Sequence, residues 1–256
     1  MDNFKILLKK DFLEFKRTKK WIVFLIVFPA IAILSSVLAK VLLSALAPVF
    51  EMMGLTYEPT IADSYAQFVA NMAETGYLLI AIMFSITLVK EKSSSTYYVL
   101  KSNGVKEREI VLSHFISKLI LITVSYLASV VAFVVMNLIL FRSYTGYRGV
   151  VSLSFTYLLL VFALCFSLFV SSFVNKKSHG YIIAIASYFV FSILYVIPKI
   201  DVFTPFYALT LSNDIMYEYS HNISDFVING ISIVVICIGL IIGSIYLFKN
   251  KVDNGK

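Results

Sequence analysis

Long apolar runs separated by short polar segments dominate the sequence. A helix needs about 20 mostly apolar residues to cross the hydrocarbon core of a bilayer. Five runs approach or exceed this length and contain no Asp, Glu or His: residues 21–43, 119–141, 150–174, 180–197 and 226–248. A sixth run, 76–89, is too short, and we extend it back to residue 70 to give a span at 70–89. The pattern predicts an all-α membrane protein with six transmembrane helices.

Composition supports this prediction. Apolar residues make up 59% of the chain and charged residues only 14%, and the mean hydropathy is +0.87. A water-soluble domain is about half apolar and about a quarter charged, so an ordinary soluble protein is excluded. We therefore expect one transmembrane domain over residues 1–256. Cys165 and Cys237 both lie inside apolar runs, where they indicate neither a disulfide framework nor a zinc site.

The charged residues alternate along the chain. Of the 22 Lys and Arg residues, 18 fall before residue 21, in 90–118, in 175–179 and after residue 248. The intervening polar segments hold four basic and eight acidic residues. By the positive-inside rule both termini are cytoplasmic, which predicts a multi-pass protein of the cytoplasmic (inner) membrane. Glu74 then lies near the outer boundary or against a protein-lined cavity.

The first 20 residues form a predicted amphipathic interfacial helix. Phe4, Leu8, Phe12 and Phe15 share one side, and most of the basic residues occupy the other. This helix either anchors and couples the cytoplasmic face to the first span or only fixes topology. On the outer side, the acidic loop 44–69 is either a lid or a connector.

The cytoplasmic segment between spans 2 and 3 predicts a helix, a turn and a second helix. Ser95 or Thr96 can cap the first helix, and Asn103-Gly104 breaks it because Gly tolerates the left-handed conformation. The second helix runs from Lys106 into the third span. Such a short helix with apolar residues suits docking of a soluble protein. The alternative is a solvated loop with basic anchors.

Before the last span, Pro198 and Pro205 bracket a largely apolar outer segment that is too short to cross. It predicts a re-entrant segment in the outer leaflet, since backbone at membrane depth is tolerated only where protein buries it. The alternative is an amphipathic loop on the lipid surface.

The spans carry little chemistry. No Asp, Glu, Arg or His lies in the middle of a predicted span, and no phosphate-binding loop sequence is present. His114, His179 and His221 lie in separate segments, so no metal site is expected. We expect a chain that is not catalytic by itself and needs no cofactor. If it transports uphill, a separate polypeptide supplies the energy.

Two patterns inside the spans have both a functional and a structural interpretation. One helical stripe on the fifth span carries four hydroxyl groups, of Tyr181, Tyr188, Ser192 and Tyr195. They form either a path for an amphiphilic substrate or hydrogen bonds between neighbouring helices. On the sixth span, Gly239 and Gly243 form a G-x-x-x-G motif that permits close helix packing.

Taken together, these features resemble the membrane (permease) subunit of a type-2 ATP-binding cassette (ABC) exporter. The family's inner loop has roughly the pattern E-x-x-x-G-T, then apolar positions, a small-residue turn and a mixed-charge stretch leading to Lys. This sequence is similar to that pattern: the corresponding residues, in order, are Glu91, Ser95-Thr96, Val99-Leu100, Ser102 to Val105, Lys106 to Ile110 and Lys118. Ser95 stands where the family has Gly. The stretch from Thr204 to Leu209 resembles the family's P-F-x-x-L element after the fifth span.

This resemblance implies a mechanism and partners. The permease works in a bacterial membrane with two ATP-binding cassette subunits, which hold ATP and Mg, and with a second copy of itself or a related permease. No nucleic acid is involved. The coupling residues would be Tyr97, Tyr98, Val99, Leu100, Lys101, Ser102, Asn103, Gly104 and Val105, flanked by Glu107 and Arg108. The competing hypothesis is a non-transporting membrane protein that acts in binding, immunity or assembly.

Overall fold

The computed structural model describes residues 2–52, 54, 58–93, 95–219 and 223–253, and these residues contain helices and connecting turns but no strand. The helices are α1 (Asp2–Thr18), α2 (Lys20–Met52), α3 (Ile61–Asn71), the π-helix η1 (Met72–Gly76), α4 (Tyr77–Phe84), α5 (Thr87–Lys92), α6 (Ser95–Ser102), α7 (Glu107–Leu140), α8 (Gly146–Phe173), α9 (Lys177–Leu194), the 3-10 helix η2 (Asp201–Phe203), α10 (Tyr207–Tyr217) and α11 (Ile223–Asp253).

Six helical segments among the described residues are long and apolar enough to span a membrane: Lys20–Val49, Ile61–Lys92, Glu107–Leu140, Gly146–Phe173, Lys177–Leu194 and Ile223–Lys249. The predicted all-helical protein with six candidate spans is therefore confirmed. The shortest apolar run in the sequence belongs to a helical segment of 32 residues, which is made up of α3, η1, α4 and α5. The protein is a multi-pass membrane protein.

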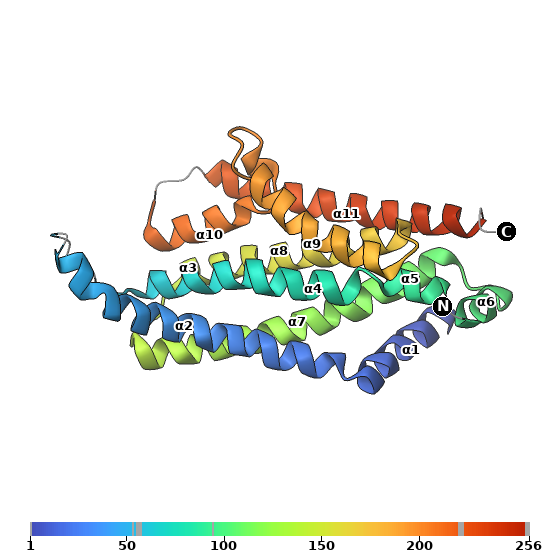
Figure 1. Ribbon diagram of the computed structural model, residues 1–256, viewed down its shortest axis with the longest axis horizontal. Helices are drawn as coiled ribbons and strands as arrows, with labels where there is room; N and C mark the ends of the chain where they lie inside the picture. The colour runs from blue at the N-terminus through green and yellow to red at the C-terminus, as the bar shows by residue number, and fades with distance from the viewer. Residues whose placement is uncertain (1, 53, 55–57, 94, 220–222, 254–256) are drawn as a thin grey trace.

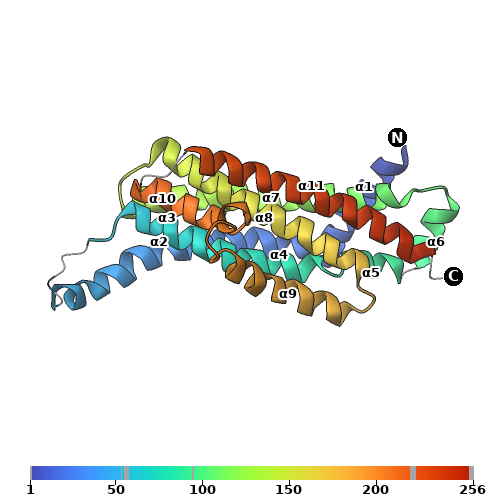
Figure 2. The same cartoon turned by 90° about the horizontal axis from the view of Figure 1, so that it is seen from above.

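The long helices run side by side along one axis (Figures 1 and 2). α8 is the central helix and packs against α4, α10 and α11, while α2 packs along α7. The start of α1, all of α6 and the last turns of α11 lie at the same end of the bundle (Figure 1). We call this the basic end, and the end that holds α10 and the α7–α8 junction the opposite end.

α1 packs against α7 and joins α2 at Lys19, which adopts a positive φ of 55°. The face that α1 buries differs from the expected one. Leu7, Asp11 and Phe15 are buried, whereas Phe12 is 42% exposed. These three positions are four residues apart and so share one helical stripe. The buried stripe is therefore rotated away from Phe12 and includes a carboxylate.

The second span has a break at Ser85 and Ile86, between α4 and α5. The backbone N–H groups of Leu88 and Val89 both donate to the Ser171 hydroxyl on α8, at 2.7 and 3.3 Å. A Cβ at Gly180 would lie 2.9 Å from the Ser85 carbonyl oxygen, so glycine permits the start of α9 to approach the break. Neighbouring helices thus satisfy and enclose the polar backbone here.

The Pro-bounded segment before the last span forms η2 and α10. α10 packs against α3 and α8 and buries Ala208, Leu211 and Met216. The Ser212 hydroxyl donates to the Ser152 carbonyl oxygen of α8 at 3.1 Å. Because protein buries this helix on one side, it is part of the bundle. The re-entrant position of the segment stays a prediction.

Candidate functional site at the basic end

α6 presents two different faces. Tyr98 and Val99 are 71% and 58% exposed, and Lys101, Ser102, Asn103 and Gly104 are exposed as well. Tyr97 is buried, and its ring meets Phe248 of α11 edge-on with 6.0 Å between centroids. One face therefore anchors α6 to the bundle, while the other face is exposed.

The anchored face belongs to a small hydrophobic cluster. The buried members come from five helices and a turn: Leu7, Leu88, Tyr97, Val105, Ile110, Val111 and Phe248. Leu100 is half-buried and packs against the cluster. Leu100 and Val105, which the sequence analysis placed among the coupling residues, thus face inward. An acidic substitution at either position would disturb the packing of α6 on the bundle, so a loss of partner binding in such a variant would not identify a direct contact.

The turn after α6 is compact. Gly104 has a φ of 76°, a conformation that glycine adopts without steric cost. The Val105 N–H donates to the Leu100 carbonyl oxygen at 3.1 Å, and Lys101 pairs with Glu107 at 3.0 Å. Arg108 is exposed and Glu107 half-buried. The structure therefore brings all eleven predicted coupling residues to one end, with an outer face centred on Tyr98 and Val99.

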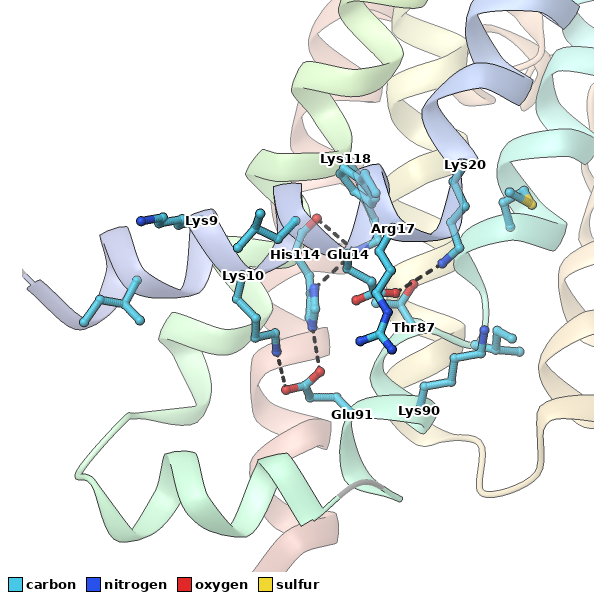
Figure 3. A pocket seen from close by; sticks show the side chains of 15 residues that line it. Lys9, Lys10, Glu14, Arg17, Lys20, Thr87, Lys90, Glu91, His114 and Lys118 are labelled. Atoms are coloured by element: carbon cyan, nitrogen blue, oxygen red, sulfur yellow. Dashed lines mark hydrogen bonds and ion pairs between the residues drawn. The ribbon is translucent and has the colours of Figure 1, made fainter.

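α5 connects this end to the rest of the bundle through Glu91. One Glu91 oxygen accepts from the Lys10 ammonium of α1 at 2.5 Å, and the other lies 3.5 Å from Nε2 of His114 on α7 (Figure 3). Next to it, Lys92 donates to the Ser172 carbonyl oxygen of α8 at 2.8 Å and lies over the Phe248 ring. Two adjacent residues thus link α5 to four other helices.

His114 continues the ionic network to α1. Its Nδ1 lies 3.1 Å from Oδ2 of Asp11, whose other contacts include a hydrogen bond from Ser117 at 3.2 Å. Asp11 is 1% and His114 2% exposed. Burial acts to raise the pKa of Asp11, but the hydrogen bond and charge of His114 and the charges of Lys118 and Lys10 lower this pKa below its ordinary value.

Lys118 completes the network. Its ammonium group lies 3.2 Å from Nδ1 of His114 and over the rings of Phe15 and Phe84. We define the charged cluster as Lys10, Asp11, Glu91, His114 and Lys118. Sequence reasoning did not find it, because it treated His114 as an isolated flanking residue. The spacing of Leu7, Asp11 and Phe15 on one stripe of α1 is the signal that a buried carboxylate lies there.

Four hydroxyl residues are half-buried here: Tyr181, Tyr188 and Ser192 of α9, and Tyr195 directly after it. Tyr188 packs against Tyr77 and Phe206, and the Ser192 hydroxyl donates to the Tyr188 carbonyl oxygen within the same helix at 2.8 Å. Tyr181 and Tyr195 lie along the same stripe. The four residues therefore lie on a half-open flank of the bundle, and in the sequence they are more than 70 residues away from the coupling residues.

The two glycines of the predicted packing motif have different surroundings. A Cβ at Gly243 would lie 3.0 Å from the Phe169 ring of α8, whereas a Cβ at Gly239 would meet nothing within 4 Å. Gly243 thus permits close packing of α11 on α8. Gly239 is exposed and makes no such contact among the described residues.

No protein-family model matches this sequence, and comparison with curated proteins gives no significant match.

Proposed function

We propose that this chain is the permease subunit of an ABC transporter of the type-2 exporter class. The observation that carries the proposal is the two-faced α6. Its Tyr97, together with Val105 of the following turn, is buried in a cluster with residues of four other helices, and its Tyr98 and Val99 are exposed. An apolar pair on an anchored helix is suited to a soluble partner.

In this mechanism the partner's ATP-driven closure displaces α6, and contacts within the chain pass the displacement on. The Tyr97 ring transmits it to α11 through Phe248. α5 transmits it to α1 and α7 through Glu91, and to α8 through Lys92. The break at Ser85 and Ile86 lets α5 move with α6 relative to α4. The helices that would bound the substrate path therefore respond together.

The orientation of the chain follows from charge. With the basic end in the cytoplasm, 18 of 22 basic residues lie on the cytoplasmic side, as the positive-inside rule requires. The same orientation puts both termini and α6 in the cytoplasm, where an ATP-binding subunit is available. The membrane is then the inner membrane of a bacterium.

The complete transporter would contain two ATP-binding cassette subunits carrying ATP and Mg and two permease chains, either identical or related. The half-open flank of α9, with Tyr181, Tyr188, Ser192 and Tyr195, would face an amphiphilic substrate. The chain itself would perform no chemistry. Its role would be to form the path and to convert partner motion into access.

The test is co-purification from the native membrane in mild detergent, with an ATPase assay on the eluate. Val99→Asp puts a charge on the exposed face of α6 and leaves its seat intact. Loss of a central contact typically costs about 2 kcal/mol, so we expect retention of the ATPase to fall roughly 30-fold. The matched control is Asn175→Asp, which adds the same charge to an exposed turn at the same end but off α6.

Equal ATPase retention in the two variants would remove α6 from the coupling role. If the wild-type chain retains no nucleotide-binding protein under several gentle conditions, the non-transporting role in binding, immunity or assembly becomes the better hypothesis.

A further inference from the structure

A cavity of about 650 Å³ opens between α1, the start of α2 and the α4–α5–α7 surface, beside the charged cluster (Figure 3). Six basic residues line it: Lys9, Lys10, Arg17, Lys20, Lys90 and Lys118. They come from segments up to about a hundred residues apart, so the fold gathers positive charge that is dispersed in the sequence.

The acidic lining residues do not neutralise this charge. They are Glu14, which pairs with Lys20 at 3.3 Å, and Glu91, which pairs with Lys10 at 2.5 Å. Within the described part of the chain, neither Arg17 nor Lys90 has an acidic oxygen within 4.0 Å. Figure 3 shows the Arg17 guanidinium extending toward the space between Glu91 and Lys90. Two cations thus remain available to an anion.

Part of the cavity lining is apolar. Ile6 and Leu13 of α1 are exposed there, and Phe15, Met83 and Ile86 also line the cavity. A free inorganic anion would contact the basic groups alone. A ligand with an anionic head and hydrocarbon chains would use both surfaces.

The position of the cavity fits such a ligand. It lies where α2 begins at Lys20 and where the second span ends near Lys90, which is the level of the lipid headgroups for helices that start and stop there. Basic pockets between membrane helices, next to an amphipathic interfacial helix, bind anionic headgroups. The only tryptophan of the chain, Trp21, adjoins Lys20 and is 40% exposed.

We propose that this cavity is a binding site for the phosphate headgroup of an anionic phospholipid, held by Arg17 and Lys90 with its acyl chains along Ile6 and Leu13. The site pins α1 to the ends of the second and third spans. It requires only that the chain is embedded in a membrane, so it stands or fails independently of an ATPase partner.

Trp21 provides the test. The full chain is placed in phosphatidylcholine nanodiscs that contain a trace of one lipid brominated on its acyl chains. This lipid is phosphatidylglycerol in one sample and phosphatidylcholine in the other, and quenching of tryptophan fluorescence is measured in both. We expect brominated phosphatidylglycerol to quench Trp21 more strongly at equal mole fraction. In Arg17→Gln/Lys90→Gln the relative affinity for phosphatidylglycerol should fall about tenfold.

The matched control is Lys5→Gln/Lys16→Gln, which removes two exposed charges of α1 that do not line the cavity. Retained preference in the control and lost preference in the cavity variant support the site. Equal loss in both variants, or no preference in the wild type, overturns it in favour of diffuse attraction to the surface. Displacement by inorganic phosphate, but not by chloride at the same ionic strength, would assign the cavity to free phosphate and overturn the lipid.

Discussion

Two buried polar groupings tie helices together in this protein, and they use different chemistry. The charged cluster joins α1, α5 and α7 through ion pairs. A second grouping, which we call the neutral seam, joins α2, α3 and α7 through hydrogen bonds. It consists of Ser35, Ser36, Ser64, Asn71 and Asn137, with Ser64 donating to Asn137 at 2.6 Å and Asn71 donating to Ser35 at 2.9 Å.

The difference follows the hydropathy of the sequence. Asp11, Glu91, His114 and Lys118 lie outside the apolar spans predicted at 21–43, 70–89 and 119–141. Ser35, Ser36, Asn71 and Asn137 lie inside these spans, and Ser64 lies six residues before the second one. A charge in hydrocarbon is expensive, while neutral side chains can hydrogen-bond there at little cost. The protein therefore fastens its helices with ions at the boundary and with amides and hydroxyls within the spans. The two fastenings should differ in strength and in response to pH.

The largest expected effect is at Glu91. Glu91→Ala leaves Lys10 and His114 without their shared carboxylate, and breaking a buried pair on one side costs about 3 kcal/mol. We expect the free energy of unfolding in mixed micelles to fall by about this amount. The control Glu58→Ala, at an exposed position, should change it little. If both variants behaved alike, the charged cluster would not be a fastening.

The pH response separates the two groupings next. The pKa of Asp11 is lower in the folded protein than its ordinary value of 3.8, so its stabilising contribution is present above that pH and is lost as the pH falls through the lowered pKa. Asp11→Asn should cost about 2 kcal/mol at neutral pH. We expect the difference in melting temperature between wild type and variant to narrow as the pH is lowered below 3.8, the ordinary pKa of Asp11.

A gap that stayed constant across this pH range would show that the Asp11 contribution is one of shape and not of charge. Ser64→Ala in the neutral seam serves as the control here, since its gap from wild type should not depend on pH.

The smallest expected effect is in the neutral seam. Asn137→Ala removes the partner of Ser64, and a hydrogen bond between membrane helices is worth about 0.6 kcal/mol on average. We expect a loss of this order in the free energy of unfolding, with little coupling to Glu91→Ala because the two sites share no partner. If Asn137→Ala lowered the free energy of unfolding as much as Glu91→Ala does, the hydrogen bonds of the neutral seam would not be the weaker of the two fastenings.

The six spans were predictable because hydropathy over about 20 residues is a strong signal. The start of the second span was not. α3 begins at Ile61 and includes Asp63, Ser64 and Asn71, which lower the local hydropathy. Burial of Asp63 is possible because its carboxylate accepts hydrogen bonds from the Thr60 backbone N–H and, at 2.6 Å, from the Tyr217 hydroxyl. Hydropathy measures the affinity of a side chain for lipid, so it does not detect polar groups whose hydrogen bonds are satisfied inside the protein.

The site shows the same division. Asn103-Gly104 located the end of α6, since the turn chemistry is local. Which of two adjacent tyrosines is buried could not be predicted, because Phe248 decides it from about 150 residues away along the chain. The charged cluster likewise assembles Asp11, Glu91 and His114 from three separate segments. Local sequence patterns therefore predict the helices, but contacts between distant residues determine which side chains of each helix are buried.

The Ser171 hydroxyl has a consequence for the tolerance of this sequence to change. One oxygen atom on α8 serves two backbone N–H groups at the break in another span. Alanine there would strand both donors, and a large side chain would not fit a fully buried position. Natural variation at position 171 should therefore be confined to serine and threonine wherever residues 85–89 keep the break, and should relax only in chains where the second span runs straight.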